Sequence, residues 1–258
     1  MELCVLASGS GGNALYVKGG GVALLVDAGL SSRQLVARMR AADIAPESIH
    51  AILLTHDHSD HYKGVDVFSR HYPVRLFANE GTASGVEREV RSLGREWEIF
   101  ETATSFEVGG LTVEAFSVSH DASDPVGFVL DDGTVRLCVI TDLGQATPLV
   151  RVKLATCDVA VVESNHDYDM LMQSQRAWTL KTRIAGRSGH LSNDDAADLV
   201  RSALSERLRA LFLAHISGQC NTPALAFATM ADMLKREGRD DVRLEVTSQD
   251  QVSTRYVF

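Results

Sequence analysis

Short apolar runs, each followed by an acidic residue or a histidine, constrain the fold of this chain more than any other feature. Continuous runs of this length are typical of strands covered on both faces, whereas an alternating run is typical of a half-buried strand. Only the run that precedes His120 alternates. The runs are Val22–Val26 before Asp27, Ala51–Thr55 before His56, Leu111–Ser119 before His120, Leu137–Thr141 before Asp142, Val159–Val162 before Glu163 and Ala210–Ala214 before His215.

Helical patterns lie between these runs. Ser31–Ala42 carries an apolar face, and Ser192–Leu204 opens with the capping-box pattern of Ser192 and Asp195. Thr222-Pro223 is typical of an N-cap followed by proline at the first helical position. Interleaved strands and helices predict a layered α/β architecture. Because ligands bind at the carboxyl ends of strands in such sheets, the six polar strand ends predict one shared pocket.

Four candidate metal ligands lie within the six residues that follow the second run. They are His56, His58, Asp60 and His61. Imidazole and carboxylate are ligands that Zn²⁺, Mn²⁺ and Fe²⁺ accept, and one such segment can serve two adjacent metals. In an extended segment, His56, His58 and Asp60 face one side, and His61 precedes a helix expected to begin near Tyr62.

The remaining strand ends complete a two-metal set. We expect His120 to join His56 and His58 at a first metal, and His215 to join Asp60 and His61 at a second. Asp142 is the natural carboxylate bridge between the two divalent ions, and the open position between them suits a bridging hydroxide. The alternatives without metal binding are a solvated polar loop at residues 56–61, a hydrogen-bonded core histidine at His120 or His215, and a helix cap at Asp142.

The bulk composition narrows the class of protein. The chain has 258 residues, five well-separated prolines and no repeat or linker, so we expect one domain over residues 1–258. Four scattered cysteines, no signal-peptide pattern and no apolar stretch long enough to span a bilayer predict a cytoplasmic protein. The net charge of −9 argues against a broad nucleic-acid footprint, but does not exclude a nuclease whose metals bring the positive charge.

The motifs carry a family resemblance. His56-x-His58-x-Asp60-His61, followed in order by His120, Asp142 and His215, resembles the signature of the metallo-β-lactamase fold. This resemblance implies a four-layer αββα sandwich with two mixed sheets and a dinuclear centre. Further motifs narrow it to the YycJ/WalJ exonuclease group, which is related to RNase Z-type nucleases. They are Ser8–Asn13, Leu25–Ser31, Glu163–Asp167 and Gly189–Asn193.

The resemblance also implies an activity. It identifies the chain as a metal-dependent phosphodiesterase, a 5′-to-3′ DNA exonuclease with nucleic acid as its substrate. Glu163 and His190 match a proton-relay pair, and either His190 or Asp60 is expected to protonate the departing oxygen. Two segments depart from the group's pattern near the expected substrate rim, and they bear on substrate choice. Cys220 stands where an asparagine is expected, and Gln173–Trp178 replaces a turn containing Gly and Tyr-Pro.

Other functions are compatible with the same residues. The alternatives are hydrolysis of a thioester, lactone or cyclic phosphodiester, ribonuclease activity, and a non-enzymatic sensor with a di-iron centre. Asp27 is expected to order the loop Ser8–Asn13 through backbone amides. The basic run of Lys181, Arg183 and Arg187 fits phosphate contact and a solvated helix face equally well.

Overall fold

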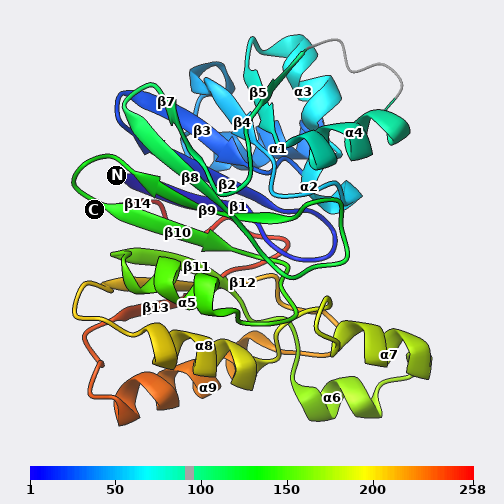
Figure 1. Cartoon of the computed structure of the whole chain (residues 1–258), viewed down its shortest axis with the longest axis vertical. Coiled ribbons are helices and arrows are strands. Elements are labelled where there is room, and N and C mark those ends of the chain that lie inside the picture. Colours follow the sequence, from blue (N-terminus) through cyan, green and yellow to red (C-terminus); the bar gives the residue numbers. More distant parts are fainter. Residues whose placement is uncertain (91–95) are drawn as a thin grey trace.

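Two seven-stranded sheets lie face to face in the computed structural model, which describes residues 1–90 and 96–258. Helices cover the outer face of each sheet (Figure 1). This arrangement confirms the predicted four-layer αββα sandwich. In the described part of the chain, no helix is long and apolar enough to cross a membrane.

The first sheet has the strand order β14-β1-β2-β3-β4-β5-β6. Its strands pair antiparallel from β14 to β3 and parallel from β3 to β6, so the sheet is mixed. The strands are β1 (Glu2–Ala7), β2 (Ala14–Gly19), β3 (Val22–Val26), β4 (Ala51–Leu53), β5 (Arg75–Ala78), β6 (Trp97–Ile99) and β14 (Tyr256–Val257).

The second sheet has the order β13-β12-β11-β10-β9-β8-β7 and is also mixed. Pairing is antiparallel from β7 to β10 and parallel from β10 to β13. The strands are β7 (Ser105–Val108), β8 (Leu111–Ser117), β9 (Val126–Asp131), β10 (Arg136–Ile140), β11 (Val159–Glu163), β12 (Ala210–Ala214) and β13 (Arg243–Val246).

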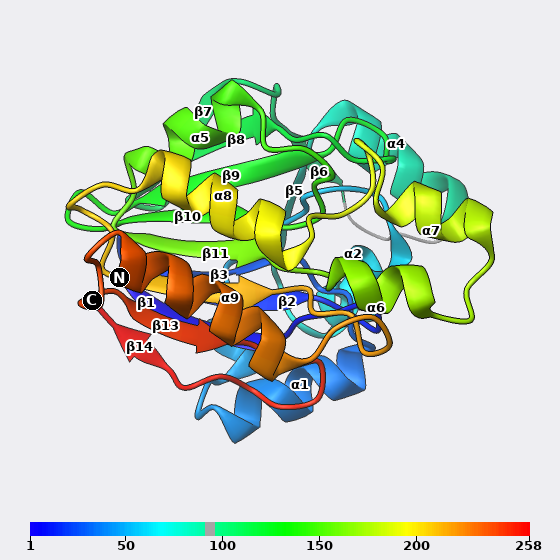
Figure 2. The same cartoon turned by 90° about the horizontal axis from the view of Figure 1, so that it is seen from below.

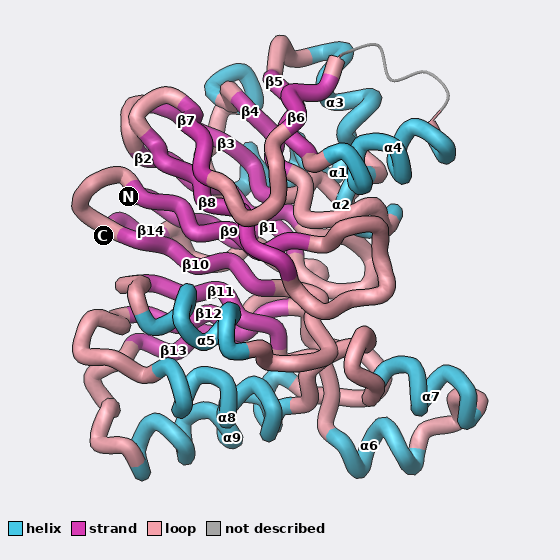
Figure 3. Tube along the Cα trace, viewed as in Figure 1, coloured by secondary structure: helices cyan, strands magenta, loops and turns pink. Residues whose placement is uncertain are grey.

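The helices divide between the two outer faces, and two of them project from the body of the sandwich. With the first sheet lie α1 (Ser32–Ala41), the 3₁₀ turn η1 (Pro46–Ser48), α2 (Ser59–Tyr62), α3 (Val65–His71) and α4 (Glu80–Glu89). The second sheet is covered by α5 (Pro148–Ala155), α8 (Asn193–Ala203) and α9 (Pro223–Arg236). The projecting pair is α6 (Tyr168–Gln173) and α7 (Trp178–Ile184), which loops join to each other and to the sandwich (Figures 1 and 3).

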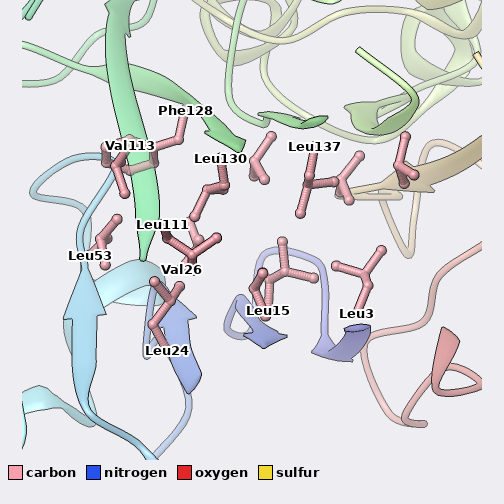
Figure 4. Packing of buried hydrophobic residues seen from close by; sticks show 14 of the residues in the cluster. Leu3, Leu15, Leu24, Val26, Leu53, Leu111, Val113, Phe128, Leu130 and Leu137 are labelled. Carbon is pink, nitrogen blue, oxygen red and sulfur yellow. The ribbon is translucent and has the colours of Figure 1, made fainter. Parts of the chain in front are cut away.

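Burial on both faces explains why the strand runs are continuously apolar. In β3, Leu24 and Val26 pack between the sheets, whereas Leu25 packs against the helices of the outer layer. Figure 4 shows this inter-sheet core, in which Leu24 and Leu53 of the first sheet face side chains of the second. The predicted strands therefore form as expected, because each buries two apolar faces at once.

The three helices predicted over residues 31–42, from Ser192 and from Thr222 all form, the last two with their predicted caps. Ser31 accepts a hydrogen bond from the Gln34 amide at the start of α1, and Ser192 and Asp195 form the capping box of α8. Thr222 caps α9, with Pro223 at the first helical position. A helix was also predicted to begin near Tyr62, where α2 lies, but the strands β1, β2, β5 to β7, β9, β13 and β14 and the helices α3 to α7 were not among the predicted elements.

Stability rests on the inter-sheet core, which gives the first prediction. Leu24→Ala removes a fully buried side chain and should lower the free energy of unfolding by about 2–5 kcal/mol. Leu225→Ala, on the exposed side of α9, should change it by less than about 0.5 kcal/mol. Urea denaturation of both variants tests this expectation, and equal losses would contradict it.

Candidate metal centre

The polar residues that follow six strands meet at one edge of the sandwich. Parallel strands of both sheets end at this edge, which brings the loops after β3 and β4 against those after β10, β11 and β12. Short contacts across the sheets confirm the predicted shared pocket, among them His61 Nε2 to Asp142 Oδ2 at 3.2 Å. The helices α6 and α7 lie beside this edge (Figure 2).

The segment after β4 changes from extended to helical within the ligand cluster. Helix α2 begins at Ser59, with His58 as its N-cap, so Asp60 and His61 lie in a helical turn. The expectation that Asp60 shares an extended face with His56 and His58 was therefore wrong, and so was a helix start near Tyr62. The amide of His61 donates to the His58 carbonyl at 2.9 Å, and this turn separates the ligands into two groups.

The first group comprises His56, His58 and His120, whose candidate ligand atoms lie within 4.8 Å of one another. His58 Nδ1 and His120 Nε2 are 3.2 Å apart. The second group comprises Asp60, His61 and His215. Asp60 Oδ2 lies 3.6 Å from His61 Nε2 and 3.7 Å from His215 Nε2. The structure thus brings together the two triads that the sequence predicts.

Asp142 lies between the two groups. Its Oδ2 is 3.2 Å from His61 Nε2, and its Oδ1 is 3.5 Å from His215 Nε2 and 3.9 Å from His120 Nε2. Asp142 does not cap a helix, because α5 begins at Pro148 with Thr147 as its N-cap. One carboxylate therefore faces both triads, which is the geometry a bridging ligand needs.

The donor atoms of this cluster fit divalent cations. His56 Nε2, His215 Nε2 and Asp142 Oδ2 are buried without a hydrogen-bond partner, which is costly unless another species binds them. The opposite nitrogens of four rings are already engaged, as metal-binding histidines require. These contacts are His56 Nδ1 with Thr55 Oγ1, His61 Nδ1 with Asp27, His120 Nδ1 with the Gly189 carbonyl and His215 Nδ1 with Glu163.

The electrostatics indicate a site built for positive charge. Burial opposes ionisation of Asp142, but the surrounding His215 and His61 outweigh burial and hold its carboxyl pKa well below the usual range. Burial alone would lower the pKa of His215, yet Asp142 and Asp60 raise it to about 10. Burial lowers the pKa of His56 well below its usual value, so that this ring stays neutral and able to bind metal.

Three residues at strand ends adopt the left-handed backbone region. They are Asp27 with φ of 62°, Asp142 with φ of 55° and His215 with φ of 57°. This region is uncommon outside glycine, and Asp and His are among the residues that tolerate it best. Because such strained positions cluster at functional sites, the backbone independently marks the same edge of the sandwich.

Asp27 has a different role from the expected one. Its carboxylate accepts hydrogen bonds from Thr55 N at 2.9 Å, Thr55 Oγ1 and His61 Nδ1, so it orients the ligand segment. The prediction that it orders the loop Ser8–Asn13 was wrong. That loop is held by Asn13 Oδ1, which accepts from the Gly9 amide, and by Gln249 Oε1, which accepts from the Gly11 amide.

Glu163 and His190 form the expected pair. His190 Nδ1 lies 2.7 Å from Glu163 Oε1, and Glu163 Oε2 accepts from the amides of Leu143 and Leu191. Glu163 is fully buried, whereas His190 keeps 21% of its side chain exposed. Burial lowers the pKa of His190, but the charge of Glu163 outweighs it and raises that pKa above the usual value.

A cavity of about 230 Å³ opens over the cluster. It contains predicted site residues and others that the sequence analysis missed. Its lining residues are Ser10, His58, Asp60, His120, Asp121, Asp142, Asn165, Arg176, Leu180, Arg183, Ile184, Gly189, His190, His215 and Ser217. The residues that the sequence analysis did not single out are Asp121, Leu180, Ile184 and Ser217, which lie in loops and on α7, where no sequence pattern connects them to the strand ends.

Some residues of the basic run and of the two departures from the family pattern line the cavity, and others lie outside its lining. Arg183 lines the cavity, but Lys181 is buried, its Nζ donating to the Met172 carbonyl, and Arg187 is exposed. Cys220 is buried away from the cavity lining, whereas Arg176 of the second departure lines it. Only one of the two departures therefore reaches the substrate rim.

The fold and this ligand cluster define a class, the metal-dependent hydrolases of the β-lactamase superfamily. Residues 23–216 match the family model described as "Beta-lactamase superfamily domain", so the chain belongs to this superfamily. The fold is one that binds divalent metal ions, which the donor set described above fits.

Several proteins resemble the chain along most of its length. The exodeoxyribonuclease YycJ of Bacillus anthracis is 35% identical over 92% of this chain and 90% of its own. The exodeoxyribonuclease WalJ of Streptococcus pneumoniae is 38% identical over 89% and 87%. A ribonuclease Z of Mycobacterium is 27% identical over 84% and 76%. Zn²⁺-bound PqqB of Methylobacterium extorquens shares the fold, with a TM-score of 0.69, 18% identity and coverage of 98% and 99%.

A close backbone contact beside the cluster gives the second prediction. A Cβ on Gly29 would lie 1.6 Å from the Asp60 carbonyl oxygen, so Gly29→Ala must displace the turn that carries Asp60 and His61. We expect metal affinity to fall about 10- to 100-fold, as when an outer contact of a metal ligand is lost. Metal titration measures the effect, with circular dichroism to confirm the fold.

Gly218→Ala is the matched control for this variant. Nothing lies within 4 Å of a Cβ at Gly218, so its metal affinity should match that of the unchanged protein. Tight metal binding by Gly29→Ala would show that the contact with Asp60 does not position the ligands.

Proposed function

We propose that this protein is a dinuclear metal-dependent phosphodiesterase, a 5′-to-3′ exonuclease that acts on DNA. The observation that carries the proposal is the placement of Asp142 between two triads, with the His190–Glu163 pair in the same cavity. The names of the relatives at 35% and 38% identity, both exodeoxyribonucleases, support DNA as the substrate.

Seven side chains would hold the metals. His56, His58 and His120 would bind one ion, and Asp60, His61 and His215 the other, with Asp142 reaching both. When bound, two divalent cations supply a hydroxide nucleophile at neutral pH and take up charge on the phosphate oxygens. Zn²⁺, Mn²⁺ and Fe²⁺ all accept this donor set.

We assign His190 as the acid that protonates the departing oxygen. Its ring lines the cavity, and Glu163 holds its Nδ1, which leaves Nε2 as the proton donor. The same carboxylate oxygen of Glu163 lies 3.0 Å from His215 Nδ1. Glu163 therefore positions both the acid and one proposed ligand.

Asp60 is the second residue assigned to proton transfer. Burial opposes ionisation of its carboxyl, but the neighbouring imidazoles of His215 and His61 outweigh burial and lower its pKa. An ionised Asp60 accepts a proton from the attacking water more readily than it donates one. His190 is therefore the acid and Asp60 the base.

The net charge of the chain favours cleavage at the end of a DNA strand. A net charge of −9 leaves little surface for the many phosphate contacts that a broad nucleic-acid footprint needs. Contact with DNA is then confined to the cavity over the cluster, which the end of one DNA strand can enter. This restriction is what an exonuclease requires.

The third prediction concerns substrate and polarity. Protein loaded with Mn²⁺ or Zn²⁺ should shorten DNA labelled at its 3′ end stepwise while releasing mononucleotides from the 5′ end. Parallel reactions with RNA, a lactone and a thioester distinguish the other hydrolases of this fold. Faster turnover of RNA or of either acyl substrate than of DNA would overturn the proposal, as would shortening from the 3′ end.

The fourth prediction separates metal ligands from the proposed acid. His58→Ala and Asp142→Asn should abolish hydrolysis and lower the metal content of a folded protein. His190→Ala should lower kcat by about 10²–10⁴-fold with unchanged metal content. The control is His71→Ala, at an exposed position of α3, which should change neither quantity. Full turnover by Asp142→Asn would contradict the two-metal assignment.

A further inference from the structure

Arg176 brings a positive charge to the cavity, and its guanidinium has no partner among residues 1–90 and 96–258. It lies in the turn between α6 and α7 and lines the same cavity as His190 and Asp142. Its Nε is buried and has no hydrogen-bond partner. Among the described residues, no carboxylate lies within ion-pair distance of its guanidinium.

The neighbouring cations of the α6–α7 segment are engaged. Arg183 also lines the cavity, but its Nε lies 2.6 Å from Asp121 Oδ2. Lys181 donates to the Met172 carbonyl at 2.5 Å and so ties α7 to α6. Arg176 is thus the lining cation whose charge the described residues leave uncompensated.

The carboxylates of the cavity are occupied as well. Asp142 and Asp60 lie against the imidazoles of the metal cluster, and Asp121 pairs with Arg183. A buried guanidinium donor without an acceptor is destabilising, because it has lost its hydrogen bonds to water. A bound ligand can supply this acceptor, and the planar fork of arginine matches phosphate oxygens well.

The wall around Arg176 suits a nucleotide. Leu180 and Ile184 lie one turn apart on α7 and line the cavity with it. Phosphate can bind the guanidinium while the sugar or base packs on these two apolar side chains. Among the described residues, Arg176 pairs with neither Asp60 nor Asp142, so its guanidinium does not belong to the contact network of the metal cluster.

We propose that Arg176 binds a second, non-scissile phosphate of the substrate strand and thereby determines substrate specificity. This inference rests on the proposed nuclease function. It adds a phosphate subsite outside the metal cluster, on the segment where the sequence departs from its family. A substrate with a single phosphate gains nothing from the subsite, whereas an oligonucleotide does.

The test compares Arg176→Gln with Arg187→Gln, which removes the same charge from an exposed position outside the cavity lining. For single-stranded DNA, we expect Arg176→Gln to raise KM about 10- to 100-fold, the value of hydrogen bonds to a charged group, with little change in kcat. Turnover of bis(p-nitrophenyl) phosphate and metal content should stay unchanged. Arg176→Lys, a point charge without the fork, should restore only part of the affinity.

Two forms of the DNA identify the phosphate. A larger effect on 5′-phosphorylated than on 5′-hydroxyl DNA assigns the terminal phosphate to Arg176, and equal effects assign an internal one. An unchanged KM in Arg176→Gln, or an equal loss on bis(p-nitrophenyl) phosphate, overturns the inference.

Direct binding separates this inference from the proposed function. Fluorescence anisotropy of labelled DNA should show affinity falling at least about tenfold in Arg176→Gln and staying constant in Arg187→Gln. If the unchanged protein binds DNA without cutting it, the proposed function fails while the subsite is still measured. If it cuts DNA and Arg176→Gln binds equally well, only the subsite fails.

Discussion

The buried carboxylate of Asp27 is the constraint on which the site depends. It accepts hydrogen bonds from Thr55 and His61, and Thr55 Oγ1 in turn lies 2.9 Å from His56 Nδ1. Because Thr55 donates its single proton to Asp27, it accepts one from His56, which leaves Nε2 of both histidines free for metal. One carboxylate at the end of β3 thus fixes the tautomer of one ligand in each triad. The backbone of Asp27 is in the left-handed region, and the hydrogen bonds of this network hold it there.

Much of the fold follows from the sequence because burial on two faces leaves a strong pattern. Runs such as Val22–Val26 and Ala210–Ala214 are apolar throughout, and caps such as Ser192 with Asp195 mark helix starts. Short edge strands such as β14 leave no such pattern, because two residues show no periodicity and depend on pairing with β1. The left-handed turns after β10 and β12 also leave no pattern, although they aim Asp142 and His215 at the cluster.

Some features of the candidate site could likewise be predicted from the sequence, and others could not. The candidate ligands could be predicted from their positions at or just after strand ends, and the structure brings all seven together. The helical turn at Asp60 could not, because four residues are too few for a helical period. The segment Gln173–Trp178 was expected near the substrate rim, but the role of Arg176 within it could not be predicted. Its significance lies in what it does not contact, and a sequence does not show an absent partner.

The division between metal cluster and α6–α7 segment has a consequence for function. The cluster is built from buried strand ends, where a change of one side chain alters packing in both sheets. The α6–α7 segment projects beyond the sandwich (Figure 2) and contributes Arg176, Leu180 and Ile184 through side chains that the core does not need. Substitutions there can alter which substrate is held without disturbing the metal ligands. On the proposed function, one ligand set would serve different phosphate substrates, and the cavity-lining residues of the α6–α7 segment would make the choice in this chain.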